Sequence, residues 1–353
     1  MQSLGELMLI EELDYQTRQF LTLFVYVENP VEEKEKLRLK TLLKGGRHEV
    51  TSRLDVPLYK RDGYKIPEDE VLLKNQNKVY LGNSLYHNIR YTYQYRNRLF
   101  WGFTAEKDAG EPFGSYGNKA YDAYSFHFLL KDCGKLKALA LGDYRLGFGE
   151  GLVVNSDFSL GKSTLFNMGD TRPSIKKFSS TSETSFFRGI AAAFRFGRVD
   201  MSAFYSYLPT DATLRKDGTI SSLKTDGLHR TLLELSKKHN VTEQSVGTDV
   251  TWNTEYFSLG AIVFYQHFSR SFSKGTELYR QYYPDGKDFL NAGLHYRWHR
   301  DRFSFSGETA FSNVYGGWAT LNKAIYRFNH NGTKISAAKM NGINMVSRIN
   351  DFL

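Results

Sequence analysis

The sequence has no long apolar run, a single cysteine and no recognisable secretory signal. No stretch approaches the roughly 20 consecutive apolar residues that a membrane-spanning helix needs, which excludes a helical membrane protein. Cys133 cannot form an internal disulfide, which excludes a disulfide-stapled scaffold and a cysteine-rich zinc site. Residues 1–12 lack a basic start and a small-residue cleavage site. We therefore expect either a cytoplasmic protein or a chain that is missing its true start.

Large apolar side chains and charges are both plentiful. Aromatic residues make up 15% of the chain and charged residues 24%, which is too many large apolar side chains for a disordered chain. The net charge of +9 suggests nucleic acid as a partner, but the basic residues are dispersed along the chain. Scattered lysine and arginine suit an anionic layer of lipid headgroups equally well, so charge alone does not decide between these partners.

Alternation of apolar and polar residues with a period of two is the strongest signal in the sequence. It predicts five β-hairpins in a row, over residues 85–105, 124–146, 190–207, 246–265 and 290–311. In 136–146 the even-numbered residues from Leu136 to Leu146 form the apolar face, with Lys137, Asp143 and Arg145 opposite. Residues 47–58 and 318–328 could form two further strands, so about 11–12 strands are visible.

The connections between these strands alternate in length. Each hairpin closes with a turn of about two or three residues, whereas long connections cover 107–120, 150–184, 209–243 and 269–287. Short turns on one side and long loops on the other are typical of a transmembrane β-barrel. We therefore predict an all-β, antiparallel up-and-down transmembrane β-barrel with a short helical N-terminal segment. The alternative is a large soluble antiparallel fold with one solvated face.

The two faces of the predicted strands differ in chemistry. Aromatic residues gather near strand ends, where an aromatic girdle would lie at the membrane interface: Tyr93, Tyr95, Phe194, Phe196, Tyr205, Tyr207, Tyr296 and Trp298. The opposite face carries charges that would be costly in a dry core but suit a wet or plugged lumen. The residues predicted to line the lumen are Arg90, Glu106, Asp143, Arg145, Arg195, Asp200, Asp249, His295, Arg297 and Glu308. Asp143 and Arg145, with Arg195 and Asp200, could form inward ion pairs, either as lumen packing or as a constriction that selects solutes.

The ends of the chain are less regular than its middle. We expect a helical N-terminal segment over 1–46, the β-barrel region over 47–328 and a polar tail without alternation over 329–353. None of the strands is an evident partner to close the barrel, and an open sheet edge is not tolerated at membrane depth. These features suggest a fragment of a larger barrel protein.

Three segments resemble a Bacteroidota family of helix-hairpin-helix domain-containing proteins. They are FTAEKDAGEPF at 103–113, YRLGFGEGLVVN at 144–155 and SLKTDGLHRT at 222–231. The resemblance runs from about residue 5 to about residue 328 and implies a predicted outer-membrane β-barrel. A helix-hairpin-helix motif binds DNA phosphate through a glycine-containing hairpin, whereas the corresponding turn here, residues 10–14, has no glycine and two added carboxylates. DNA is therefore not expected as a partner.

Other motifs have both a functional and an ordinary interpretation. Gly161–Thr164 imitates the end of a phosphate-binding loop but lacks the glycine five residues earlier, so a polar loop is the simpler interpretation. His295 and His299 have no carboxylate or cysteine beside them to complete a metal site. Ser125 and His127 share the inner face of one strand, and a serine and a histidine are the residues that a hydrolase uses as nucleophile and base; two unrelated lumen residues are the simpler interpretation. Residues 107–111 begin a long connection and could be a structured loop or a cation site.

These patterns favour a non-enzymatic outer-membrane β-barrel protein, acting in solute passage or as a surface or scaffold protein. Outer-membrane lipid is the expected partner, with a periplasmic or surface protein as a further one. No catalytic residue, metal or cofactor is expected. The alternatives are a protein that binds DNA or a partner through its N-terminus while the barrel anchors it, and an outer-membrane hydrolase.

Overall fold

The structure is a computed structural model that describes residues 16, 17, 20, 45–65, 77–117, 120–156, 174–274, 278–280, 283–300, 302–314, 316–327 and 334–342. The chain divides into two units, residues 1–44 and 45–353, and the second contains the whole β-sheet. The predicted helical segment over 1–46 lies almost wholly outside the described residues, although residues 16, 17 and 20 are helical. The phosphate-loop-like segment Gly161–Thr164 also lies outside them.

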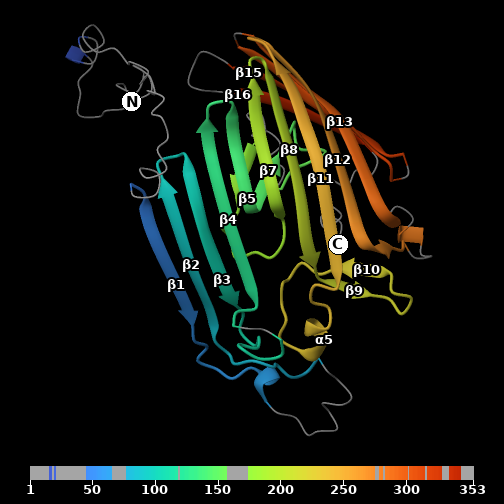
Figure 1. Ribbon diagram of the computed structural model, residues 1–353. Helices are drawn as coiled ribbons and strands as arrows, with labels where there is room; N and C mark the ends of the chain where they lie inside the picture. The colour runs from blue at the N-terminus through green and yellow to red at the C-terminus, as the bar shows by residue number, and fades with distance from the viewer. Residues whose placement is uncertain are drawn as a thin grey trace. The chain divides into compact units, whose positions relative to one another are not determined.

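Thirteen strands follow one another across a single antiparallel sheet (Figure 1). Each strand pairs with the next one on this path. They are β1 (Arg47–Asp55), β2 (Tyr86–Tyr95), β3 (Leu99–Lys107), β4 (Ala123–Cys133), β5 (Leu136–Gly147), β7 (Phe187–Phe196), β8 (Val199–Thr210), β11 (Val241–Asn253), β12 (Phe257–Phe272), β13 (Gly286–Arg300), β14 (Phe303–Ser312), β15 (Trp318–Arg327) and β16 (Lys334–Gly342).

The predicted fold class, an all-β up-and-down antiparallel sheet of the barrel type, is confirmed. The five hairpins close with turns at 96–98, 134–135, 197–198, 254–256 and 301–302, at what we term the turn end of the sheet. The longer connections leave the sheet after β1, β3, β5, β8 and β12, at the opposite, loop end. Within the described residues β1 and β16 each pair on one side only, so the sheet is not closed.

Short elements lie in the long connections: η2 (Asp62–Tyr64), β9 (Ala212–Leu214), β10 (Ile220–Leu223), α5 (Leu232–Leu235) and η4 (Leu278–Arg280). A further short strand, β6 (Ser174–Lys177), pairs with the end of β5 and contributes Ile175 to the inner core. β9 and β10 pair with each other, and β10 also pairs with the end of β12. In the part of the chain that the structure describes, no helix combines the length and the apolar composition required to cross a bilayer.

The C-terminal region corrects one expectation from the sequence. Residues 329–353 were expected to be a polar tail without strand character, but β16 pairs with β15 from Arg327↔Lys334 to Ala319↔Gly342. A strand is held by backbone hydrogen bonds to its neighbour, so a polar segment can pair without the alternation that would reveal it in the sequence. β16 therefore adds, at the end of the main path of the sheet, a strand that the sequence pattern does not predict.

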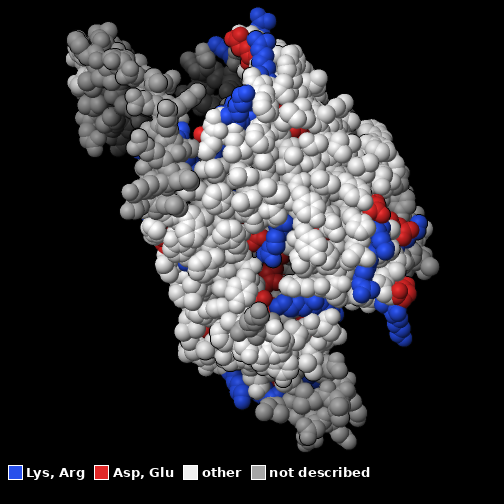
Figure 2. All heavy atoms as spheres, in the orientation of Figure 1, with Lys and Arg blue, Asp and Glu red and all other residues white. Residues whose placement is uncertain are grey.

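The two faces of the sheet have the opposite polarity to those of a soluble protein. In β8, Met201 and Tyr205 are each 43% exposed, whereas Ser202 and Ser206 are buried. The same pattern recurs along the sheet, and we term the exposed apolar side the outer face; it includes Phe103, Phe126, Ile190, Val246, Val250, Leu259, Val263, Leu290, Leu294, Phe305 and Phe311. Figure 2 shows this face as largely uncharged. Water does not favour such a surface, since polar groups normally face solvent and apolar groups the interior.

Strand β5 departs from the face assignment made from the sequence. Its even-numbered residues were expected on the outward apolar face, but Ala138, Ala140, Tyr144 and Leu146 are buried in the interior. Leu141, an odd-numbered residue, is exposed instead. The reason is that a large apolar core inside the sheet and the apolar outer face both take apolar side chains, and alternation alone cannot distinguish these two destinations.

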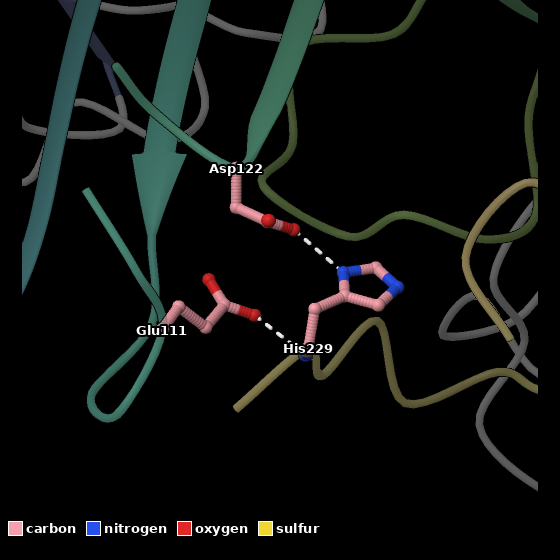
Figure 3. Close-up of side chains that lie close together, drawn as sticks. All are labelled: Glu111, Asp122 and His229. Carbon is pink, nitrogen blue, oxygen red and sulfur yellow. Dashed lines mark hydrogen bonds and ion pairs between the residues drawn. The ribbon is translucent and has the colours of Figure 1, made fainter. Parts of the chain in front are cut away.

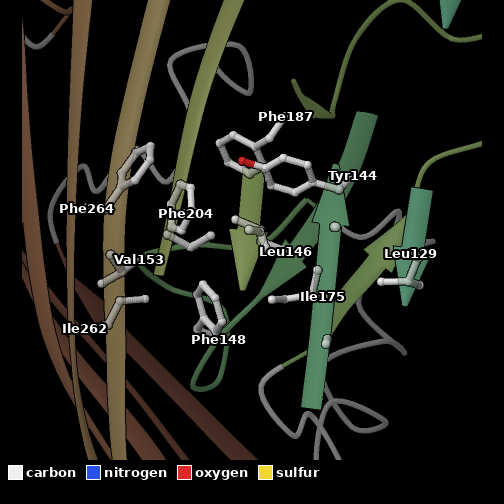
Figure 4. Packing of buried hydrophobic residues seen from close by; sticks show 14 of the residues in the cluster. Leu129, Tyr144, Leu146, Phe148, Val153, Ile175, Phe187, Phe204, Ile262 and Phe264 are labelled. Carbon is white, nitrogen blue, oxygen red and sulfur yellow. The ribbon is translucent and has the colours of Figure 1, made fainter. Parts of the chain in front are cut away.

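That core fills the interior of the sheet. Residues 148–156, which we term the inward segment, leave the end of β5 and pack Phe148 and Val153 against side chains of β7, β8 and β12 (Figure 4). The Phe148 and Phe204 rings stack with centroids 6.1 Å apart, and Phe204 stacks on Phe264 at 6.0 Å. The interior between these strands is therefore packed rather than open.

Candidate functional site

One buried carboxylate, on a strand far from β5 along the sheet, fixes the inward segment in place. Glu308 of β14 is fully buried, and its Oε2 accepts the backbone N–H groups of Glu150 at 2.6 Å and Leu152 at 3.1 Å. Its Oε1 accepts the N–H of Val153 at 3.1 Å. Gly149 adopts a φ of +57°, and a Cβ there would lie 2.7 Å from Glu308 Oε2. Successive backbone N–H groups around one anion form a cradle that orders the segment.

A second polar pair crosses three strands of the inner face. His295 Nε2 of β13 lies 2.7 Å from Asp249 Oδ1 of β11, and both side chains are buried. Gly260 of the intervening β12 makes this possible, because a Cβ there would lie 2.3 Å from the imidazole ring. Alternation in the sequence predicts both residues on the inner face, but their pairing depends on strand register and could not be predicted from alternation.

A cavity of about 600 Å³ lies at the turn end of the inner face. Arg195 and Asp200, on either side of the turn between β7 and β8, form an ion pair there with Nε and Oδ1 2.5 Å apart. Arg297 lies 3.8 Å from Glu150 of the inward segment, and His299 also lines the cavity. The cavity thus has basic and acidic groups on the same wall.

The ten residues predicted to line a lumen occupy three kinds of environment. Those that are buried are Glu106, Asp143, Asp249, His295 and Glu308. Those that are half-buried are Arg90, Arg145, Asp200 and Arg297, and Arg195 is exposed. Of the predicted pairs, Arg195–Asp200 is present, but Asp143 pairs with Arg188 and not with Arg145. Their role in lining an aqueous lumen stays a prediction.

The eight predicted girdle residues are also not alike. Phe194, Phe196, Tyr205, Tyr207 and Trp298 are exposed, and Tyr296 is half-buried. Tyr93 and Tyr95 are buried, and the Tyr93 ring meets the ring of His48 edge-on with centroids 4.8 Å apart. The first five have the exposure that an interfacial aromatic needs, whereas Tyr93 and Tyr95 do not.

The loop end holds a cluster of buried charges that the sequence pattern did not reveal. His229 lies between two carboxylates, with Nδ1 2.6 Å from Asp122 Oδ2 and Nε2 2.5 Å from Asp211 Oδ2. Lys238 donates to Asp122 Oδ1 at 2.7 Å. The backbone N–H of His229 donates to Glu111 Oε1 at 2.9 Å, so Glu111 and Asp122 approach the histidine from separate segments (Figure 3). We term Glu111, Asp122, Asp211 and His229 the His229 cluster.

The charges of the cluster shift its pKa values in opposite directions. Burial disfavours an imidazolium, but the hydrogen bonds and charges of Asp122 and Asp211 outweigh it and raise the pKa of His229 to about 10. Burial would raise the pKa of Asp122, but hydrogen bonds from His229 and Lys238 lower it to about 2. Burial and the charge of Asp122 raise the pKa of Glu111 to about 7. Burial also raises the pKa of the neighbouring Glu183 to about 8.

Two groups of side chains in this region have metal-ligating atoms within 4.8 Å of one another: Glu111, Asp122 and His229, and Glu183, Asp211 and His229. A metal would need a lone pair on the imidazole. Both ring nitrogens already face carboxylates at hydrogen-bond distance, which favours the protonated ring. In this arrangement His229 is itself the cation that the carboxylates surround. Residues 107–111, for which a structured loop and a cation site were both open, form an ordered loop in which the Asp108 N–H donates to Glu111 Oε2 at 2.8 Å.

The three segments that carry the family resemblance have structural roles in these sites. Segments 103–113 and 222–231 meet in the His229 cluster through Glu111 and His229. Segment 144–155 contains most of the inward segment and supplies the N–H groups that bind Glu308. Asp122, Glu183 and Asp211 were missed because none of them has an acidic or histidine residue next to it in the sequence, and only folding brings them together.

The catalytic and metal alternatives from the sequence find no supporting geometry. Ser125 Oγ and both ring nitrogens of His127 have no hydrogen-bond partner among the described residues, so they do not form a serine–histidine pair. His295 is bonded to Asp249, whereas the exposed His299 ring lies beside Tyr256, with ring centroids 6.3 Å apart.

Comparisons with known proteins give only remote likenesses. No protein-family model and no curated protein matches the chain. A porin structure refined at 1.8 Å resolution is 12% identical, covers 74% of this chain and 89% of its own, and has a TM-score of 0.34. An anion-selective porin from Comamonas acidovorans is 12% identical, covers 83% and 90%, and has a TM-score of 0.29. A mutant of the Rh. blastica porin is 13% identical, covers 72% and 85%, and has a TM-score of 0.25.

Proposed function

We propose that this chain is a lipid-embedded β-barrel protein of the bacterial outer membrane. The observation that carries the proposal is the apolar outer face, on which large side chains are exposed along strand after strand while polar side chains are buried behind them. A bilayer accepts this arrangement, since strands alternate apolar-out and polar-in in transmembrane barrels. Outer-membrane lipid is then the principal partner, and the family resemblance to Bacteroidota barrel proteins agrees with this location.

The role we propose is non-enzymatic, in solute passage or as a surface or scaffold protein. The inward segment and its aromatic contacts fill the space between β7, β8 and β12. Passage along the interior therefore requires that this segment move, which makes a gated or selective route more consistent with the structure than a permanently open pore. The charged cavity at the turn end would then meet the solute once the segment is displaced.

The test is whether the full chain behaves as a membrane barrel. The protein is folded into detergent micelles and run on an SDS gel with and without heating, and its flotation with lipid vesicles is measured. We expect faster migration of the unheated sample and flotation with the vesicles, because a folded barrel stays compact in SDS. Recovery of a folded, soluble monomer from buffer without detergent would contradict the proposal.

A further inference from the structure

The continuous row of paired strands, which we term the wall, is interrupted next to β4. β4 pairs with β5 from His127↔Gly142 to Cys133↔Leu136. Beyond Gly142, β6 takes the place of β4 beside β5, from Tyr144↔Lys177 to Gly147↔Ser174, while β7 pairs along the other edge of β5 from Leu136 to Tyr144. Residues 123–126 of β4 therefore have, among the described strands, only β3 as a partner. Gly142 sits at the divergence with a φ of +81°, and a Cβ there would lie 2.2 Å from the carbonyl oxygen of Phe126.

An ion pair takes the place of the missing strand contacts. Asp143 and Arg188 lie with Oδ1 and Nε 2.6 Å apart. Arg188 Nη2 also donates to the carbonyl oxygen of Tyr124 at 3.0 Å, and the Phe126 N–H donates to Asp143 Oδ2 at 3.2 Å. These charge-assisted bonds satisfy backbone groups that could not be left unpaired in a membrane. Figure 2 shows a small group of charged side chains in the middle of the largely uncharged face, near the ends of β4 and β7.

Two cavities meet at this interruption. One, of about 420 Å³, is open to the outer face and is lined by Phe103, Phe126, Gly142 and Asp143 together with four further residues. The other, of about 200 Å³, reaches behind the wall toward residues 180–186 and the long connection after β8. The four residues Thr104, Tyr124, Ser125 and Arg188 line both cavities. The two cavities therefore lie side by side at the same four residues, at the gap in the wall.

The lining changes from apolar to polar along this path, because hydroxyl side chains and charged groups surround the inner cavity, and of these charged groups Asp122 and Lys238 pair with each other. Phe103, Tyr124 and Phe126 form an exposed aromatic rim on the outer face. Behind them, Thr104 and Ser125 are cross-strand partners, and their hydroxyl oxygens are buried without a hydrogen-bond partner among the described residues. Further hydroxyl side chains line the inner cavity: Ser180, Thr181, Ser182, Thr184, Ser185 and Thr210.

We propose that this gap is a lateral binding site for an amphiphile with a hydrocarbon tail and an uncharged, hydroxyl-bearing headgroup. The tail lies on the aromatic rim in the membrane, and the headgroup hydroxyls bond to Thr104, Ser125 and the serine and threonine side chains behind them. A hydroxyl both donates and accepts, as the hydroxyls of a sugar or glycerol headgroup do. The inference rests on the proposed insertion of the outer face in lipid.

The test uses a monoacylglycerol with a photoreactive diazirine in its acyl chain, added to the full-length protein in lipid nanodiscs. After illumination, labelled peptides are identified by mass spectrometry. We expect labelling concentrated on residues 103–104, 124–126 and 180–188. Ser125→Trp, which fills the junction of the two cavities, should reduce that labelling at least tenfold. The control Val250→Trp, an exposed position of the outer face on β11, should leave it unchanged.

A second comparison keeps the proposal testable if Ser125→Trp does not fold. The double variant Thr104→Val, Ser125→Ala removes the two hydroxyls without adding bulk and should lower labelling by the monoacylglycerol about fivefold. The methyl ester of the same diazirine acid lacks a hydroxylated headgroup and should label the site several-fold less. Labelling spread evenly around the outer face, or equal labelling by both probes, would overturn the lateral site. Failure of the protein to enter nanodiscs would instead contradict the proposed membrane location.

Discussion

Replacement of Glu308 by alanine should release the inward segment. The substitution leaves three backbone N–H groups, those of Glu150, Leu152 and Val153, without their acceptor inside the sheet. A buried donor without a partner costs about 1–3 kcal/mol. Because the half-buried Leu152 can regain a bond from water, two buried donors remain, and we expect a total loss of about 2–6 kcal/mol, which is a large part of a typical folding free energy.

Two assays separate the effect on the segment from a general loss of stability. Urea unfolding of the protein in lipid vesicles measures the free energy, and planar-bilayer recording measures conductance. Glu308→Ala should unfold at lower urea and should open conducting states that the unmodified protein does not show. Glu308→Gln keeps one acceptor oxygen, so its unfolding free energy and its conductance should lie between those of Glu308→Ala and the unmodified protein.

The matched control is Glu243→Ala, since Glu243 is also buried on the inner face but, among the described residues, accepts only from the Ser245 hydroxyl, at 3.2 Å. Glu243→Ala should lower the unfolding free energy by less than Glu308→Ala does, and it should open no conducting states. The reasoning is refuted if Glu308→Ala is as stable and as closed as the unmodified protein, or if the control opens it equally.

Three further predictions follow from the outer face, the His229 cluster and the wall interruption. Val250→Arg, at an exposed position of β11, should lower the unfolding free energy in vesicles by about 2–4 kcal/mol, while Glu255→Arg in the adjoining turn should change it little; equal effects would contradict lipid contact. The raised pKa of His229, about 10, gives stability that is complete below its unfolded value near 6.5 and is lost as pH rises through 10, whereas the raised pKa values of Glu111 and Glu183 lower stability earlier, as pH rises from their unfolded value near 4.5 to about 7 and 8. Hydrogen exchange over 211–240 should therefore quicken between pH 7 and 10 beyond its intrinsic pH dependence, and His229→Gln should show faster exchange already at pH 6; a corrected profile without this rise would contradict the cluster. Gly142→Ala should destabilise the folded protein by about 1–3 kcal/mol because of the left-handed backbone and the close Phe126 carbonyl, and a variant as stable as the original would show that the divergence of β5 tolerates a side chain.

Much of the sheet could be predicted because its strands repeat a local pattern. Alternation located the five hairpins, and the contrast between short and long connections gave their up-and-down order. Both signals come from neighbouring residues, and neither needs knowledge of the partners. They failed where contacts with distant segments decide the structure. β16 is held by backbone pairing with β15, and the apolar even-numbered residues of β5 face the inner core and not the outer face.

The contacts within the sites could not be predicted without the fold. Asp249 and His295 could be assigned to one face, but their bond depends on register across β12 and on the missing side chain of Gly260. The His229 cluster joins residues up to 118 positions apart, and the Glu308 contacts join residues up to 158 positions apart. Single acidic residues in long connections carry no pattern that marks them in advance.

By itself, the sequence determined the strand period, the order of hairpins and the inversion of polarity between the two faces, because a pleated strand sends successive side chains to opposite sides. Only the tertiary structure decided that the interior is filled, that Glu308 holds the inward segment and that the wall opens beside β4. Those features depend on which backbone groups find partners across the sheet, and that is settled by distances between segments far apart in the chain.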